Sequence, residues 1–228
     1  MKTCDIDRHA VELKRDGYTI AHDVMSEAEL ETSKQAIEET LSAEEEIGYK
    51  YGLQNEDLRM AFNGQAKHPH FYGILVRHPQ PAEVVRRVLG NDMFCHDMAI
   101  RVPMPTGTKD KTRLGGNLHA DWSDFTVAPF IGGKHFAMGI QSVWAITEFT
   151  AETGGPMVWP GSHLALEIPP EEPETLPAGG IVVEAPAGSV VMWDSALWHT
   201  GGINQSDRPR HSLVFYFQRW WVKGFNDS

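Results

Sequence analysis

The second half of this chain is patterned as β-strands, whereas most of its first 90 residues are patterned as helices. Short apolar runs separated by glycine and proline clusters begin near residue 96, which favours a β-sandwich or a barrel. The expected strands are 98–102, 139–146, 189–193 and 212–217. A further short strand is expected at 181–183, inside an otherwise exposed loop at 168–187 that carries five prolines. We therefore expect a mainly β fold whose core is buttressed by N-terminal helices.

Helix-capping residues support this division of the chain. A first helix is expected to end at about Asp16, and a strand follows at Tyr18–Ala21. Ser26 and Glu29 form a capping box that opens a second helix. Pro81 suits the first turn of a third helix, which ends at a glycine. We expect these helices to support the β core, not to form a separate domain.

Length and composition indicate one globular domain. The chain has 228 residues, of which 41% are hydrophobic and 22% are charged. We expect a single domain over 1–228, mostly helical in 1–90 and β in 91–228. A formal net charge of −11 disfavours nucleic acid and anionic membranes as partners. Two cysteines form no disulfide framework and no signal peptide or membrane span is seen, so a cytoplasmic location is expected.

Three residues form a candidate metal site. His119 and Asp121 are two apart, so on an extended strand both side chains point to the same face. His199 follows 78 residues after Asp121, at the end of an apolar strand. Two imidazoles and one carboxylate make the facial triad that holds Fe(II) and leaves positions open.

Arg210 lies 11 residues beyond His199 and indicates a dicarboxylate ligand. A planar guanidinium binds a carboxylate with two parallel hydrogen bonds, so it suits the far end of a diacid whose other end chelates the metal. Ser212 is two residues further on, on the same face, and is expected to add a hydroxyl donor.

Two long segments resemble the phytanoyl-CoA dioxygenase family. They are 144–163, which includes the turn Pro160-Gly161-Ser162-His163, and 188–217, which includes His199 and Arg210. The strand after Asp16-Gly17 and the helix that follows are also similar, whereas 45–80 matches poorly.

The resemblance implies a double-stranded β-helix enzyme that uses Fe(II), 2-oxoglutarate and O2. It implies that His119, Asp121 and His199 bind the iron and that Arg210 pairs with the distal carboxylate of 2-oxoglutarate. On the same basis, Trp144 is expected to wall the cosubstrate pocket. Asn117 shares the face of His119 and is expected to donate to the other carboxylate. Core packing remains an alternative for both of these residues. Gly201 stands where relatives often carry a hydroxyl, which leaves the remaining cosubstrate contacts open.

The substrate is less constrained than the chemistry. Trp122 and Phe125 directly follow the metal motif and are expected to form part of an apolar substrate wall. Arg101 is a weaker candidate, for a carboxylate of cosubstrate or substrate or for a plain ion pair. We expect a small metabolite, in a specialised biosynthetic pathway, while the oligomeric state stays open. Lys109 and Arg113 are further cations near the motif.

Asp121 indicates the kind of reaction. Halogenases of this superfamily carry a small residue at this position, so a carboxylate predicts hydroxylation or another oxidation at a C–H bond, with 2-oxoglutarate converted to succinate and CO2. Two alternatives are a non-catalytic β-helix binding module and a zinc cupin-type hydrolase or isomerase. His68 and His70 are expected to be structural residues of a loop, and His163 is expected to brace its turn. His211 is out of phase with Arg210 on its strand and is expected to face outward.

Overall fold

A seven-stranded antiparallel sheet organises the protein, seen in a computed structural model that describes residues 3–49, 52–55, 57–107, 116–121, 130–131, 134–165, 167–170 and 175–222. The strands of this sheet run in the order β1-β10-β7-β12-β4-β3-β2. Their bounds are β1 Tyr18–Ala21, β2 Gly52–Gln54, β3 Leu58–Ala61, β4 Met93–Pro103, β7 Gly139–Ala145, β10 Val190–Asp194 and β12 Ser212–Arg219. Strands from both ends of the chain therefore share one sheet, and three of the seven come from the first 90 residues.

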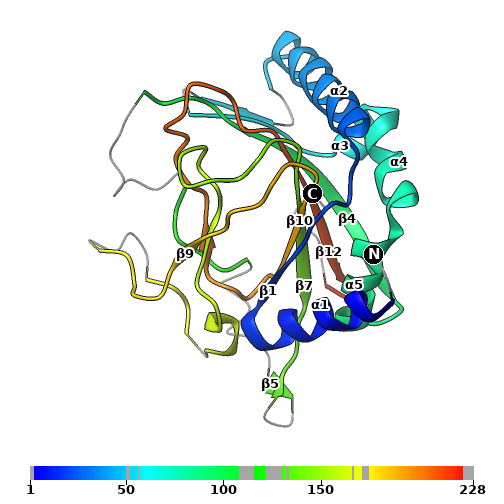
Figure 1. Cartoon of the computed structure of the whole chain (residues 1–228), viewed down its shortest axis with the longest axis vertical. Helices are drawn as coiled ribbons and strands as arrows, with labels where there is room; N and C mark the ends of the chain where they lie inside the picture. The colour runs from blue at the N-terminus through cyan, green and yellow to red at the C-terminus, as the bar shows by residue number, and fades with distance from the viewer. Residues whose placement is uncertain are drawn as a thin grey trace.

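Five α-helices of the described residues cover one face of this sheet, called the outer face here (Figure 1). They are α1 Thr3–Asp16, α2 Glu27–Glu46, α3 Gly64–Lys67, α4 Pro69–Arg77 and α5 Pro79–Leu89. Apolar residues of α1, α2, α4 and α5 form one buried cluster with alternate strand residues, among them Ile100, Trp144 and Phe215. Because side chains alternate along a strand, the residues between these face the opposite way.

The opposite, inner face of the sheet packs against a smaller three-stranded sheet, β11-β8-β9. The bounds of the remaining short elements are β5 Phe130–Ile131, β6 Lys134–His135, β8 Met157–Val158, η1 Ser162–Leu164, β9 Ile181–Val182 and β11 His199–Thr200. A second buried cluster includes Ala99, Val143 and Val214 from the large sheet, and Val158 and Val183 from the smaller layer. Figure 1 shows β9 across from the helices.

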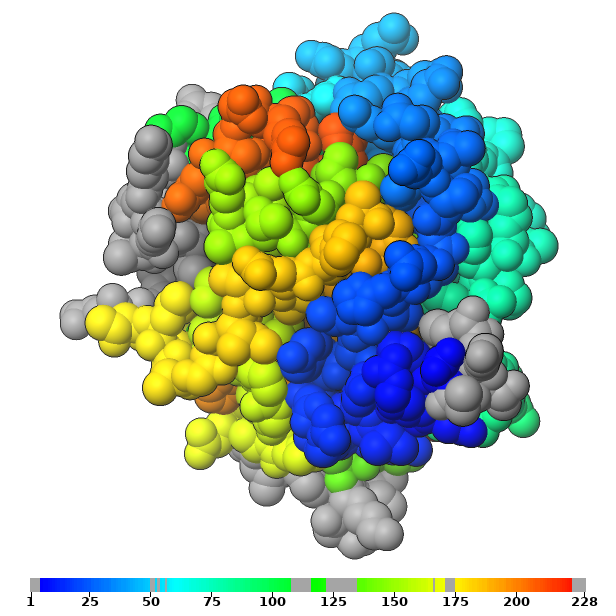
Figure 2. All heavy atoms as spheres, viewed as in Figure 1, coloured from blue at the N-terminus to red at the C-terminus, as the bar shows by residue number. Residues whose placement is uncertain are grey.

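The N-terminal segment closes one edge of the large sheet. In Figure 2 the blue N-terminal residues run alongside the yellow-to-gold part of the chain, consistent with antiparallel pairing of β1 and β10. Gly17 lies between α1 and β1 with φ +84, and a Cβ there would approach His163 Nδ1 to 2.5 Å. Only glycine accommodates both this backbone conformation and this close contact.

The expected elements correspond closely to the observed ones. α1 ends at Asp16, β1 spans Tyr18–Ala21, and α2 carries the capping box of Ser26 and Glu29. The four long strands were placed at 98–102, 139–146, 189–193 and 212–217, and the sheet contains β4, β7, β10 and β12 at these places. The third helix was also predicted correctly, because α5 begins at Pro79, has Pro81 in its first turn and ends before Gly90.

The segment from 45 to 80 was the least predictable, and it holds β2, β3, α3 and α4. The expected loop position is wrong for His70, which lies in α4, whereas His68 lies between α3 and α4 and caps α4. Their structural role fits: His68 Nε2 lies 3.2 Å from Glu39, and His70 Nε2 lies 2.8 Å from Ser33 Oγ. No helix in the described ranges is both long and apolar enough to cross a lipid bilayer.

Candidate metal centre

Backbone hydrogen bonds hold the three candidate ligands together. His119 and His199 form an antiparallel bridge in which each backbone N–H donates to the other carbonyl, at 3.0 and 2.8 Å. Two residues further along, Asp121 N donates to Ser195 O at 2.8 Å. One ligand atom from each of the three side chains then lies within 4.8 Å of the others. The pairing of two distant segments creates the site.

Both imidazoles present the same nitrogen to the centre. Nδ1 of His119 lies 2.8 Å from Asn117 O, and Nδ1 of His199 lies 2.8 Å from Leu197 O. A carbonyl only accepts, so each Nδ1 carries the proton and each Nε2 keeps a free lone pair. The two Nε2 atoms lie 3.9 and 3.8 Å from the same oxygen, Oδ1 of Asp121. This is the tautomer and orientation that a metal ligand requires.

Asp121 is oriented by a residue that the sequence interpretation missed. Gln141 Nε2, on the inner face of β7, donates to Oδ2 of Asp121. The hydrogen bond leaves Oδ1 as the oxygen that faces both histidines. The signal for Gln141 was weak: it is a polar side chain in an otherwise mostly apolar strand, on the same face as Val143.

Burial keeps His199 in the form that binds metal. Desolvation lowers the pKa of His199 to about 4, and the positive partial charge of His119 acts in the same direction, while the Asp121 carboxylate opposes it. His199 is therefore neutral at neutral pH. Two neutral imidazoles and one carboxylate suit a divalent first-row metal such as Fe(II). Among the described residues, His119, Asp121 and His199 form the group whose ligand atoms lie close enough together to hold a metal ion.

Arg210 is a buried cation with no acidic partner in the described part of the chain. Its side chain is 6% exposed, its guanidinium carbon lies 4.6 Å from the centroid of the Phe149 ring, and its buried Nε makes no hydrogen bond. Burial and the nearby Arg101 lower the pKa of Arg210 to about 9, so it remains charged at neutral pH. A buried charge is costly unless it is paired, and this position is therefore suited to an anionic ligand.

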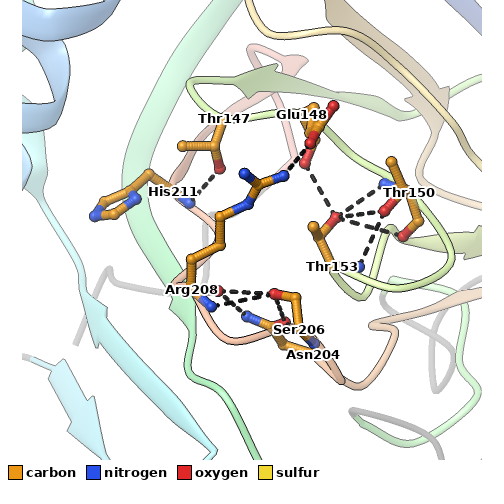
Figure 3. A network of polar contacts seen from close by, with 8 residues as sticks. All are labelled: Thr147, Glu148, Thr150, Thr153, Asn204, Ser206, Arg208 and His211. Atoms are coloured by element: carbon orange, nitrogen blue, oxygen red, sulfur yellow. Dashed lines mark hydrogen bonds and ion pairs between the residues drawn. The ribbon is translucent and has the colours of Figure 1, made fainter.

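A polar network holds the chain just before Arg210 (Figure 3). Asn204 Nδ2 donates to Pro103 O at 3.0 Å and to Arg208 O at 2.7 Å. Pro103 O also accepts from Arg210 N at 3.1 Å. In Figure 3, Arg208 extends towards Glu148, with which it forms an ion pair. These contacts tie the start of β12 to the end of β4, where Arg101 lies.

Two expected cosubstrate contacts do not fit the structure. Trp144 is fully buried on the outer face, where its Nε1 donates to Ser142 Oγ at 3.1 Å and its ring packs near His78 and Phe215. Strand alternation therefore turns it away from His199, so it does not wall the site. Ser212 uses its one hydroxyl proton in a 2.8 Å bond to Arg101 O, which leaves no donor for a carboxylate.

Of the remaining candidate residues, some lie within the described ranges and some outside them. Arg101 lies on the inner face of β4, opposite Ser212 in the register. Asn117 is exposed next to His119, and its role towards a carboxylate stays a prediction. Trp122 and Phe125 lie outside the described residues, as do Lys109 and Arg113.

The Pro160–His163 turn supports the strand that leads to His199. Ser162 Oγ accepts from Trp198 N at 2.8 Å, and Trp159 N donates to Trp198 O at 3.0 Å. His163 is fully buried, and its Nε2 lies 3.3 Å from Lys14 O. His163 thus has the structural position that was expected of it.

Known proteins were compared with this chain. The profile of the family described as "Phytanoyl-CoA dioxygenase (PhyH)" matches residues 13–212. The uncharacterised protein Mb1539 of Mycobacterium bovis is 29% identical over 91% of this chain and 73% of its own length. The dioxygenase af480 of Aspergillus fumigatus is 22% identical over 94% of this chain and 67% of its own length.

Solved structures share the fold. The epimerase SnoN, crystallised with Fe3+, alpha ketoglutarate and nogalamycin RO, superposes with a TM-score of 0.73 at 18% identity, covering 96% of this chain and 85% of its own. EctD from S. alaskensis, crystallised with 2-oxoglutarate and 5-hydroxyectoine, gives a TM-score of 0.72 at 19% identity, covering 93% and 75%. The expected fold class, a mainly β double-stranded β-helix with helical support, is confirmed.

Proposed function

The chain belongs to the phytanoyl-CoA dioxygenase family, and from that premise we propose that His119, Asp121 and His199 hold Fe(II) while Arg210 binds 2-oxoglutarate. The enzyme is a dioxygenase dependent on Fe(II) and 2-oxoglutarate. The observation that carries the residue assignment is the convergence of two Nε2 atoms on Oδ1 of Asp121, at 3.9 and 3.8 Å.

Each residue has a distinct task in this proposal. The bound iron, with 2-oxoglutarate and O2, supplies the oxidising chemistry that breaks a C–H bond. The Asn117 and Leu197 carbonyls fix the two imidazoles. Gln141 fixes the Asp121 carboxylate. Arg210 neutralises the distal carboxylate of 2-oxoglutarate, which is the anion that its enclosed site needs.

We propose a small metabolite as the substrate. SnoN was crystallised with nogalamycin RO, EctD with 5-hydroxyectoine and HygX from Streptomyces hygroscopicus with hygromycin B, and all three are small molecules. The reaction is oxidation at a C–H bond without halogenation, because Asp121 occupies the position that a halide would need. Hydroxylation is the outcome we favour.

The decisive experiment measures succinate released from 2-oxoglutarate by the purified protein. We expect release that requires Fe(II), that Zn(II) does not support, and that increases with a substrate found in a metabolite screen. A binding module would release no succinate with any metal. A zinc hydrolase would act in the absence of 2-oxoglutarate. His119→Ala in the same assay separates site-specific turnover from the chemistry of free iron, and turnover equal to wild type would contradict the assignment of the ligands.

A further inference from the structure

Two arginines, not one, reach the inner face beside the candidate metal centre. Arg101 comes from β4 and Arg210 from the turn before β12, and the backbones of the two strands are joined in register there. Among the described residues, neither guanidinium forms an ion pair with a carboxylate. Two arginines beside one another repel, so an anionic ligand would be favourable at both positions.

Arg101 lies close to the metal ligands. It lies on the inner face of β4, where Arg101 is in register with Ser212 of β12. The same face of β12 carries Tyr216, which is in register with Gln141, the residue that holds Asp121. The charge of Arg101 also acts on His199. Its Nε is buried and has no hydrogen-bond partner. The Arg101 side chain is partly exposed, whereas Arg210 is enclosed, so Arg101 is the more accessible of the two.

No described group neutralises Arg101. Burial raises the pKa of Tyr216, so its phenol is uncharged at neutral pH and supplies no counter-charge. Asp97 lies on the same face of β4, but its Oδ1 accepts from Asn63 N at 2.9 Å and Met98 N at 2.7 Å.

The proposed cosubstrate does not neutralise Arg101 either. This step rests on the proposed function. Fe(II) and the Asp121 carboxylate together carry one positive charge, and Arg210 adds a second. The two carboxylates of 2-oxoglutarate cancel these charges, so the loaded centre is neutral without Arg101. Among the groups that the structure describes, Arg101 then remains as a cation without a counter-charge, and it is partly exposed.

We propose that Arg101 binds an oxyanion of the substrate, a carboxylate in the first instance, and that this enzyme therefore selects acidic small molecules. An arginine offers a carboxylate two parallel hydrogen bonds, and Nε is one of the donors available for this geometry. The salt bridge formed in this way would fix the substrate relative to the iron. The same chemistry could be supplied by the metal-chelating carboxylate of 2-oxoglutarate, and the experiment separates these two sources.

The first arm of the test titrates 2-oxoglutarate into the anaerobic Fe(II) protein and follows the metal-to-ligand charge-transfer absorption. Arg210→Gln is expected to weaken binding roughly ten- to a hundredfold, which is the range of a lost charge-assisted pair. Arg101→Gln is expected to stay within about threefold of wild type. If Arg101→Gln weakens binding as much as Arg210→Gln does, Arg101 binds the cosubstrate and our proposal is wrong.

The second arm uses matched carboxylic acids and primary amides: 3-phenylpropionate, cyclohexanecarboxylate and decanoate, each with its amide. The readout is the concentration at which each compound perturbs the absorption of the anaerobic Fe(II)–2-oxoglutarate protein. We expect at least one acid to bind about tenfold or more tightly than its amide. Arg101→Gln should abolish this preference and Arg101→Lys should retain part of it.

Arg87→Gln is the matched control, because Arg87 pairs with Asp7 and Glu83 on the helical side of the molecule. It should keep the preference for acids. Equal binding of every acid and its amide in the wild type, or a preference that survives Arg101→Gln, overturns the proposal. Wild-type protein without any charge-transfer absorption would instead contradict the proposed function, so the two failures are distinguishable.

Discussion

Neighbouring residues at the start of β12 face opposite sides of the large sheet, and the two sides differ in whether they bury apolar or charged side chains. Arg210 reaches the inner face with no counter-ion in the described residues, and Arg101 is in the same situation. Leu213 and Phe215 point to the outer face, where they pack with the helices in a continuous apolar cluster. The outer face therefore buries mainly apolar side chains, whereas the inner face carries two cations that have no counter-ion among the described residues.

The two faces of the large sheet therefore make different contributions, one mainly to stability and the other to ligand binding. Apolar burial drives folding, and the outer face contributes most of it through residues from four helices. The inner face retains a carboxylate, two histidines and two arginines, all of which would be costly without the ligands they are proposed to bind. Inner-face substitutions should then change ligand binding, and outer-face substitutions should change the free energy of unfolding.

The largest effect is expected from His199→Ala. Loss of one of three ligands should weaken Fe(II) binding and turnover by at least about a hundredfold, since even second-shell partners of metal ligands contribute ten- to a hundredfold. Anaerobic iron titration and succinate release measure this. His22→Ala, at an exposed histidine, is the matched control and should behave as wild type. Unchanged iron stoichiometry and affinity in His199→Ala would end the assignment of this ligand.

Trp144→Ala tests the outer face. The side chain is fully buried, so its removal should lower the free energy of unfolding by about 3–5 kcal/mol. Denaturation in urea measures this. The KM for 2-oxoglutarate of the folded fraction should not change, because Trp144 points away from the ligands. Trp220→Ala, at a residue 65% exposed, should shift stability by less than about 0.5 kcal/mol. A raised KM in Trp144→Ala would restore its expected role as a pocket wall.

Substitutions of Arg210 should change the KM for 2-oxoglutarate without lowering stability, which is the opposite of the result expected for Trp144→Ala. Arg210→Leu is expected to raise the KM for 2-oxoglutarate by roughly ten- to a hundredfold, through loss of a charge-assisted bidentate contact. Arg210→Lys should recover only part of the affinity, because an ammonium group lacks the fork geometry. Stability should not fall in Arg210→Leu, since the change removes an unpaired buried charge. Steady-state kinetics that are indifferent to Arg210→Leu would transfer the role to another cation, with Arg101 first.

Gln141 allows the two faces to be compared on a single strand, because it lies on β7 within three residues of Trp144 but faces inward. Gln141→Leu should weaken Fe(II) binding by about tenfold through a less well oriented Asp121. Anaerobic titration of the two proteins measures this. Gln218→Leu is the matched control at another buried glutamine, which donates to Val222 O and does not contact Asp121. Equal iron affinity in Gln141→Leu and wild type would show that Asp121 is oriented without it.

The sequence predicted some residues of these two faces better than others. Residue types, spacing and family resemblance together predicted that His119, Asp121 and His199 converge, and the structure brings these side chains together, while their roles and that of Arg210 stay proposals. The capping box at Ser26 correctly predicted the start of α2. The placement of Trp144 was not identifiable from family resemblance alone. Its face depends on strand phase, and a shift of one residue reverses every side chain.

Residues whose roles depend on tertiary contacts were also hard to predict from the sequence. Gln141 was missed because its role depends on Asp121, which is 20 residues away in the chain. Ser212 was misjudged because the sequence does not show that Arg101 O takes its proton. The helices at 64–77 were missed because short helices packed on a sheet are fixed by tertiary contacts more than by local propensity.

The smallest expected effect concerns His211, which follows Arg210 directly but faces α2. Its Nε2 lies 2.7 Å from Glu38, whose other oxygen pairs with Arg59, and burial lowers the pKa of His211. The neutral form is thus favoured in the folded protein, and below about pH 6.5 the unfolded chain takes up more protons at this residue. Stability should therefore fall as the pH drops through 6.5.

Replacement of His211 by glutamine tests this pH dependence. Glutamine can still donate to Glu38 but does not titrate, so the loss of stability between pH 7.5 and pH 5.5 should be smaller in His211→Gln, by on the order of 1 kcal/mol. Urea denaturation at the two pH values measures it. At pH 7.5 the KM for 2-oxoglutarate should match wild type, since the side chain lies on the outer face, away from the proposed ligands. A KM that rises as it does in Arg210→Leu would show that adjacent residues on opposite faces are coupled, which contradicts the separation of stability from ligand binding.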